Sequence, residues 1–245
     1  MNYTTVAEML GDDFVDQPIE YGTEADLRVR LYQLLTDQLA TQDSLDAKVY
    51  EPTLSGETRS YKKEYKRTVE SKLRKRGSIN RVRLDLSVDK RRKYDLVCFK
   101  EDIQSPINWV RSGSKRFDEH DLDGVFGLKF IKNKCYAPMR CSITDDRILD
   151  MGLSELQSEF NQKENSIGSD IEELNSVPSD VTAIFILVSN NNYLFLDPLT
   201  EAELGERKKI QAGHAARDWL QDAADGVEIL YVHPGGVRWI VPLDG

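Results

Sequence analysis

The chain has 245 residues, which is long enough to bury a substantial hydrophobic core. Its composition, with 40% hydrophobic and 31% charged residues, is typical of a globular protein. Its longest purely apolar run, residues 183–188, is too short to cross a bilayer, and the first residues lack the pattern of a secretory signal. We therefore expect a cytoplasmic protein with no membrane partner. Its three cysteines, none of them in a CxxC motif, are expected to be reduced thiols.

The net charge of −9 is unevenly distributed along the chain. Residues 59–93 contain fifteen Lys or Arg and four Asp or Glu, a net of +11, so the rest of the chain carries −20. Such a basic segment is either a solvated surface or a local binding site for phosphates, while the acidic remainder opposes indiscriminate coating of nucleic acid.

The N-terminal part is predicted to form two helices. Residues 1–10 indicate a short one, and residues 23–40 a longer one with Thr23 as its cap and an apolar stripe of leucines at helical spacing. Glu24 shares the inward face of that stripe. It either favours the helix dipole or points into a functional site.

The middle of the chain is predicted to be mainly strands. In chain order we expect a turn-rich loop over residues 41–60, a basic helix over 61–77, and strands over 79–88, 94–99 and 125–132. Asp85 lies on the polar face of the first of these strands. The connection over residues 100–123 is long for a hairpin, which favours a mobile or substrate-facing loop.

The C-terminal half continues the alternation of helices and strands. The predicted elements are a helix over residues 145–162, a polar connector, a buried strand over 181–189, a short strand over 192–196, a helix within 200–225 and a hairpin over 227–243. This order predicts one α/β domain built around a mixed sheet.

Three charged residues lie on or beside the apolar elements of this order: Glu24 on a helix, Asp95 near the start of one strand and Lys129 within the next. The arrangement resembles the PD-(D/E)XK nuclease superfamily. The resemblance implies a restriction-endonuclease-like αβββαβ core with a central mixed sheet flanked by helices. That core would span about residues 20–190 of a single domain over 1–245, followed by a C-terminal helix and β-hairpin over 201–243.

The resemblance also implies a function, namely metal-dependent endo- or exonuclease hydrolysis of phosphodiester bonds in DNA, with RNA as an alternative substrate and a homodimer as the expected assembly. Asp95 would bind Mg²⁺ or Mn²⁺, with the Leu128 carbonyl as a further ligand, Lys129 would act on the attacking water or the phosphate, and Glu24 would complete the acidic cluster. The basic residues expected to contact the nucleic-acid backbone are Lys72, Arg74, Lys75 and Arg76.

Gly127 departs from the family pattern, because an acid is expected two residues before the lysine. Glycine offers no side-chain ligand, so Asp85 or Glu24 would have to supply the second carboxylate. Two other interpretations stay open. One is a non-catalytic module with a nuclease-like fold that binds nucleic acid or a protein, and the other is an unrelated α/β interaction protein in which Glu24, Asp95 and Lys129 lie far apart.

Overall fold

A computed structural model describes residues 2–39, 45–49, 75–79, 81–87, 93–100, 119–131, 166–190, 192, 194–196 and 204–242. Its centre is a six-stranded mixed sheet with the strand order β3-β4-β5-β6-β7-β8. The strands are β3 (Val82–Ser87), β4 (Lys93–Phe99), β5 (Leu122–Ile131), β6 (Thr182–Ser189), β7 (Val227–His233) and β8 (Gly236–Val241). Two further strands, β1 (Leu45–Val49) and β2 (Lys75–Ile79), form a separate antiparallel pair.

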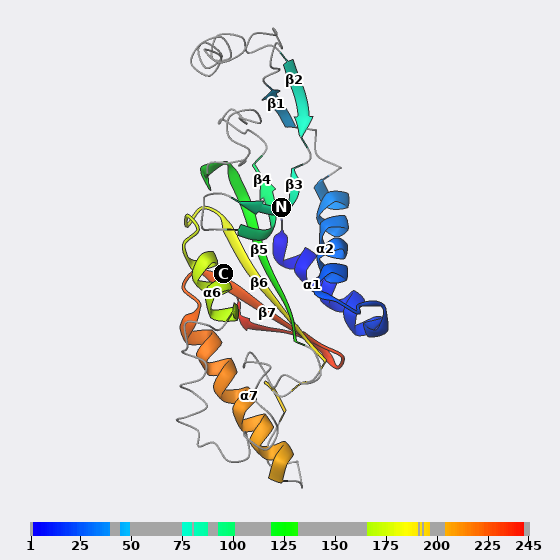
Figure 1. Ribbon diagram of the computed structural model, residues 1–245, viewed down its shortest axis with the longest axis vertical. Coiled ribbons are helices and arrows are strands. Elements are labelled where there is room, and N and C mark those ends of the chain that lie inside the picture. The colour runs from blue at the N-terminus through cyan, green and yellow to red at the C-terminus, as the bar shows by residue number, and fades with distance from the viewer. Residues whose placement is uncertain are drawn as a thin grey trace, which may run out of the picture.

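Helices pack on both faces of the six-stranded sheet (Figure 1). The helices on one face are α1 (Tyr3–Asp16) and α2 (Glu24–Leu39), and those on the other are α6 (Ser166–Asn175) and α7 (Leu204–Ala223). Short 3-10 turns, η1 (Pro18–Glu20) and η2 (Glu119–Asp121), precede α2 and β5. The result is a three-layer α/β arrangement, as the alternating pattern of the sequence predicts.

The strand directions divide the sheet into two halves. β3 pairs antiparallel with β4, and β4 pairs antiparallel with β5. β5, β6 and β7 are parallel to one another, and β8 returns as the antiparallel hairpin partner of β7. The parallel strands need long crossovers, and these include α6 and α7, both on the same face. The carboxyl ends of β5, β6 and β7 therefore meet at one edge of the sheet.

The hydrophobic core consists of two clusters, one on each face of the sheet. β6 and β7 contribute to both clusters because their side chains alternate between the faces and are buried almost throughout. On the α2 side, the leucine stripe of Leu27, Leu31, Leu34 and Leu35 is buried as predicted. This packing fixes α2 beside β4 and β5, which is what brings its first turn to the sheet.

Several predicted elements are confirmed: the helix from Thr23, the strand over 181–189, the helix within 200–225 and the C-terminal hairpin. The mixed sheet flanked by helices is confirmed as well. None of the helices in the described part of the chain is long and apolar enough to span a membrane. Cys98 is a buried free thiol, and its burial raises its pKa to about 12.

Other predictions are wrong. The loop expected over residues 41–60 contains β1, and residues 75–77, expected to end a basic helix, belong to β2. These strands pair with each other across a long sequence separation, so neither was visible as a local pattern. The polar connector contains α6, and residues 194–196 form a turn rather than a strand. The helix predicted over 145–162 lies outside the described residues.

Candidate functional site

The first turn of α2 holds Glu24 against the sheet. A reciprocal cap precedes it, in which the backbone N–H and hydroxyl of Thr23 both donate to Asp26 Oδ2 at 2.8 Å, and the backbone N–H of Asp26 donates to Thr23 Oγ1 at 3.3 Å. Glu24 then reaches across to β5, where its Oε2 accepts a hydrogen bond from the Phe130 backbone N–H at 3.3 Å. Capping thus fixes the helix start, and the start places this carboxylate at the sheet.

Asp95 occupies the point where the pairing of β4 with β5 stops. The last backbone pair is Leu96 with Phe126, and one residue further Asp95 comes beside Gly127. Its Oδ2 accepts a hydrogen bond of 2.8 Å from the Leu128 backbone N–H, so among the described residues a side chain takes the place of a strand partner here. The carboxylates of Asp95 and Glu24 therefore share the open side of β5.

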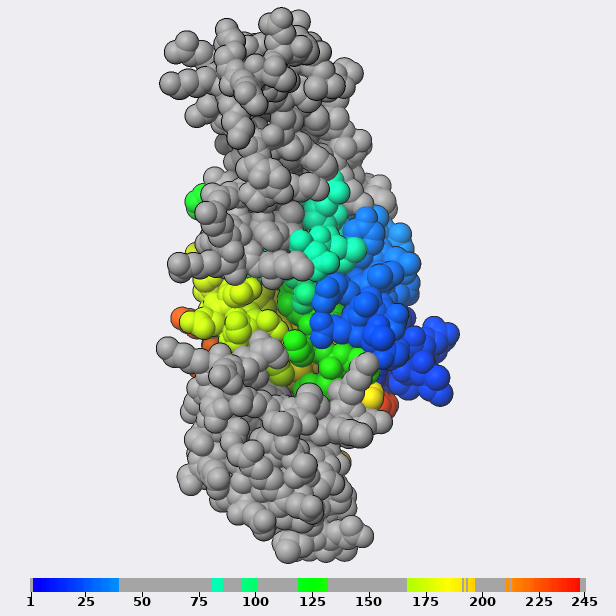
Figure 2. All heavy atoms as spheres, viewed as in Figure 1, coloured from blue at the N-terminus to red at the C-terminus, as the bar shows by residue number. Residues whose placement is uncertain are grey.

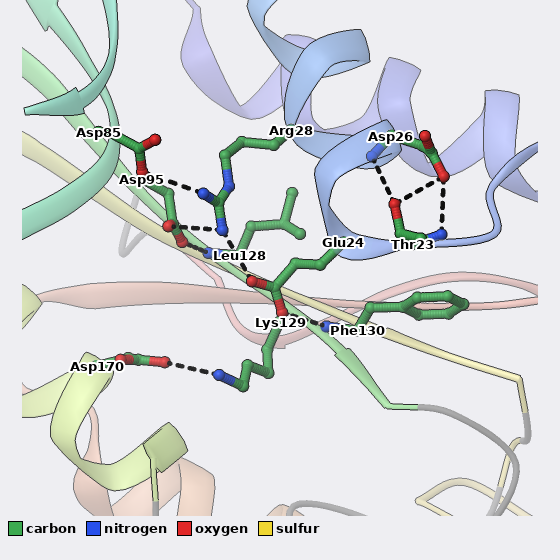
Figure 3. A network of polar contacts seen from close by, with 10 residues as sticks. All are labelled: Thr23, Glu24, Asp26, Arg28, Asp85, Asp95, Leu128, Lys129, Phe130 and Asp170. Atoms are coloured by element: carbon green, nitrogen blue, oxygen red, sulfur yellow. Dashed lines mark hydrogen bonds and ion pairs between the residues drawn. The ribbon is translucent and has the colours of Figure 1, made fainter.

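Arg28 lies between three carboxylates contributed by three elements (Figure 3). Its Nη2 is 2.8 Å from Glu24 Oε1, one helical turn earlier, and 3.1 Å from Asp95 Oδ1. Its Nη1 is 3.1 Å from Asp85 Oδ1 on β3. The guanidinium thus ties α2 to both antiparallel strands.

Asp85 adopts a backbone conformation that residues other than glycine rarely use, with φ of +51°. It lies between the paired positions Leu84–Leu96 and Leu86–Tyr94, so it faces Asp95 across the strands. Two like charges at facing positions destabilise a sheet, and Arg28 offsets that repulsion. Left-handed backbone outside glycine concentrates at functional sites, where surrounding contacts hold it in place.

Lys129 projects from β5 toward α6, where its Nζ is 3.7 Å from Asp170 Oδ2 (Figure 3). Both side chains are partly exposed, at 30% and 39%. In the space-filling view, β5 in green reaches the surface between the blue N-terminal helices and the yellow-green α6 (Figure 2). The ion pair therefore lies on a face that a ligand can approach.

The acids of this region repel one another. The pKa of Asp170 is raised to about 6, mainly by burial and further by the charges of Asp95, Glu173 and Glu24, while Lys129 opposes the shift. The pKa of Asp95 is also raised, first by burial and then by Glu24 and Asp85, against the lowering effects of the Leu128 N–H and Arg28. Acids from four elements are thus close enough to interact electrostatically.

Gly127 has no room for a side chain. A Cβ at this position would lie 2.9 Å from Phe185 Cδ2 and 3.1 Å from Leu174 Cδ1. Phe185 and Leu174 are both buried in the hydrophobic cluster beneath α6. The family's acid at this position would therefore enter an apolar, filled space, and close packing of α6 on β5 accounts for the glycine.

The structure brings most of the predicted site residues to one edge of the sheet, namely Glu24, Asp85, Asp95, Leu128 and Lys129. Of the predicted nucleic-acid contacts, Lys75 and Arg76 belong to β2, while Lys72 and Arg74 lie outside the described residues.

Two residues of this site, Arg28 and Asp170, escaped the sequence analysis. The signal for Arg28 was its position four residues after Glu24 on one helix. Asp170 was hidden because its segment was taken for a connector, although Ile167, Ile171 and Leu174 recur at helical spacing.

The described residues contain no group of three or more His, Cys, Asp or Glu side chains arranged to hold a metal ion. Mg²⁺, however, commonly binds through one or two carboxylates and completes its shell with water and substrate phosphate. Asp95 and Asp170 are carboxylates of that kind, from β4 and α6, and both are drawn with Lys129 in Figure 3. The donor types fit a hard divalent cation, although Arg28 already holds one oxygen of Asp95.

No family model matches this chain, and comparison with curated proteins and with solved structures finds no significant similarity.

Proposed function

We propose that this chain hydrolyses phosphodiester bonds in DNA with the help of Mg²⁺ or Mn²⁺, as a nuclease of the PD-(D/E)XK type in which Asp170 replaces the acid missing at Gly127. The observation that carries the proposal is the meeting of Asp95, Lys129 and Asp170, which lie far apart in the sequence, at one partly exposed edge of the sheet. Packing alone does not require an interacting group of acids there.

The charge of the site supports a divalent cation. Glu24, Asp85, Asp95 and Asp170 provide four carboxylates, whereas Arg28 and Lys129 provide two positive charges. The pKa values of Asp95 and Asp170 are raised mainly by burial and further by neighbouring acids, and a bound cation would oppose both effects.

Each residue has a role that its position supports. Asp95 and Asp170 would hold the cation, and the carbonyl of Leu128 points to the same open side of β5 as its N–H, toward Asp95. Lys129, held by Asp170, presents an ammonium group that can orient an attacking water or offset charge on the phosphate. Glu24 fixes the position of β5 through the Phe130 N–H.

A divalent cation bound there would supply Lewis-acid stabilisation of the phosphate and a water of lowered pKa. The basic segment around Lys72, Arg74, Lys75 and Arg76 would supply contacts to the DNA backbone that carry no sequence information. Replacing these four residues is expected to weaken DNA binding and flatten its salt dependence, by roughly 0.9 in log–log slope per lost phosphate contact.

A non-catalytic module that binds nucleic acid or a protein is the second candidate. The filled space at Gly127 favours it, and so do the hydrogen bonds and ion pairs that already engage all four oxygens of Glu24 and Asp95. In that case these carboxylates serve the structure by satisfying β5 N–H groups.

The test is cleavage of single- and double-stranded DNA by the purified full chain with Mn²⁺ or Mg²⁺. Asp170→Asn and Lys129→Met should each lower the rate by about 100-fold or more, because each removes a group that acts on the reacting phosphate. Asp180→Asn is the matched control, since Asp180 is an exposed carboxylate in a single ion pair with Lys100. It should leave the rate within about twofold.

Two results would overturn the proposal. An inert wild-type chain with both metals and both kinds of DNA would favour the non-catalytic module. Full activity in Asp170→Asn would place the second carboxylate elsewhere. Circular dichroism of each variant shows whether a loss of cleavage comes from unfolding instead of chemistry.

A further inference from the structure

Arg28 occupies the centre of the carboxylate group on the open side of β5. Its two terminal nitrogens contact Glu24, Asp85 and Asp95 at 2.8, 3.1 and 3.1 Å. The three acids come from α2, β3 and β4, and Figure 3 shows all of them directed at the guanidinium. These contacts form an ion-pair network, and its carboxylate oxygens are of the type that hard divalent cations also bind.

The oxygens of Asp95 show why this placement matters for a metal. Oδ2 accepts the Leu128 N–H at 2.8 Å, and Oδ1 is the oxygen that Arg28 contacts. Glu24 is used in the same way, with Oε2 on the Phe130 N–H and Oε1 on Arg28. A divalent cation can therefore reach the remaining lone pairs of Asp95 at close range only against the positive charge of Arg28, which Glu24 helps to hold there.

We propose that Arg28 is a built-in competitor of the divalent cation, a resident positive charge that must withdraw from Asp95 before Mg²⁺ or Mn²⁺ binds. This inference rests on the proposed function, because it concerns the same cation site. It adds a regulatory property to it, namely that the chain's own arginine sets the metal concentration at which the site fills.

The contacts that hold the Arg28 side chain are weak enough to be exchanged. Arg28 is 23% exposed, and its Nε is buried without a hydrogen-bond partner among the described residues, so its hold on the site depends on Nη1 and Nη2. Its partners Asp85 and Asp95 are 50% and 26% exposed. Ion pairs with that much exposure are weak enough for a divalent ion to replace.

The experiment measures Mn²⁺ binding directly, by titration calorimetry and by loss of the free-Mn²⁺ electron paramagnetic resonance signal, on the full chain without DNA. Arg28→Met should bind Mn²⁺ about tenfold tighter than wild type, since it removes the competing charge and keeps much of the side-chain volume. Adding Asp95→Asn to Arg28→Met should abolish the gain.

Arg30→Met is the matched control. Arg30 lies on the same helix and makes an ion pair of 2.7 Å with Asp13, away from the carboxylates that Arg28 contacts. Its replacement changes the net charge by the same amount and should leave Mn²⁺ affinity within about twofold of wild type. An equal gain in both variants would mean that only overall charge matters, which would overturn the inference.

Affinity in Arg28→Met equal to or weaker than wild type would also overturn it, as would an absence of Mn²⁺ binding in every form. If Arg28→Met fails to fold, Arg28→Lys decides. A lysine cannot bridge three carboxylates with a planar fork, so it should raise affinity by roughly threefold, and no rise would again count against the inference.

Measuring Mn²⁺ binding and DNA cleavage separately allows each of the two proposals to be refuted without the other. Tighter Mn²⁺ binding by Arg28→Met without DNA cleavage by any form would support the competitor role and remove the proposed nuclease function. Cleavage by wild type together with unchanged Mn²⁺ affinity in Arg28→Met would do the reverse.

Discussion

Two arginine-centred groups lie near opposite ends of β5, and they differ in charge balance and exposure. At the amino end, Arg81 is 6% exposed, donates to the Phe99 carbonyl at 2.9 Å and lies 3.7 Å from Asp123, which also accepts a hydrogen bond of 2.6 Å from the Tyr3 hydroxyl. Toward the carboxyl end, Arg28 is 23% exposed and contacts three carboxylates.

The difference separates a structural role from a functional one. Arg81 is a buried arginine that contacts a carboxylate and a backbone carbonyl, and these contacts join the start of β3 to β4 and β5. Arg28 instead contacts three carboxylates on a partly exposed edge, where a ligand can approach them. We therefore expect replacements at the first group to change stability and those at the second to change binding and catalysis.

The largest expected effect is on DNA cleavage, and the test compares one aspartate from each group, Asp95 and Asp123. Asp95→Asn should lower Mn²⁺-dependent DNA cleavage by about 100-fold or more, because it removes a proposed metal ligand. Asp123→Asn should stay within about threefold of wild type when both are assayed well below their unfolding temperatures. Equal losses in the two variants would erase the distinction between the groups.

Arg81→Met should destabilise the fold by about 2–4 kcal/mol, because it leaves Asp123 and a buried carbonyl without their arginine. Arg28→Met should cost about 1 kcal/mol or less, since its ion pairs are partly exposed. Urea denaturation in the presence of EDTA measures both. A larger cost for Arg28→Met would assign the structural role to that group instead.

Glu228 sharpens the comparison because it is a buried carboxylate without an arginine. It is 4% exposed, and neither of its oxygens has a hydrogen-bond partner among the described residues. Burial raises its pKa from 4.5 to about 7. A carboxyl whose folded-state pKa is raised stabilises the fold below its unfolded pKa, and that contribution is lost as pH rises toward 7.

Glu228→Gln should therefore flatten the fall in stability between about pH 4.5 and 7 and raise the free energy of unfolding at pH 8 by about 2–3 kcal/mol. Urea denaturation of wild type and variant at pH 4.5, 6 and 8 checks both the sign and the window. A variant that is less stable than wild type at pH 8 would show that the ionised carboxylate has a favourable partner.

A smaller effect than at Glu228 is expected at Gly127. Gly127→Ala places a Cβ against Phe185 and Leu174, so we expect a loss of about 1–2 kcal/mol from overpacking, measured by thermal or urea unfolding. Gly124→Ala is a useful companion, because there the Cβ would lie 3.0 Å from the Tyr3 ring at the other end of the strand. An unchanged free energy of unfolding in Gly127→Ala would show that position 127 can accommodate a side chain, including an acidic one.

Much of the fold was predictable because its strongest signals are local. The leucine stripe of α2, the continuous apolar run of β6 and the turn that joins β7 to β8 each reflect burial or turn chemistry within one segment. β1 and β2 were missed because their pairing joins residues 45–49 to residues 75–79, and no local pattern reports it. α6 was missed because its polar residues outweighed three apolar ones.

Part of the candidate site was also predictable. Glu24, Asp95 and Lys129 stand out because each is a charged residue on or beside an apolar pattern, and charge at such places needs a partner. Their gathering at one edge follows from the strand order, which the alternation of elements indicates. Arg28 and Asp170 carry no comparable signal, since Arg and Asp on helices are ordinarily solvated.

By itself, the sequence determined the α/β class, most elements of the central sheet and three of the charged residues at its open edge. It could do so because the local spacing of apolar and capping residues indicates burial and helix starts. The tertiary structure alone decided which charges meet. It placed Arg28 among three carboxylates, brought Asp170 to Lys129 and packed α6 onto β5 so closely that position 127 admits only glycine without displacement. Those outcomes depend on distances between segments far apart in the chain, which only the packing of helices on the sheet sets.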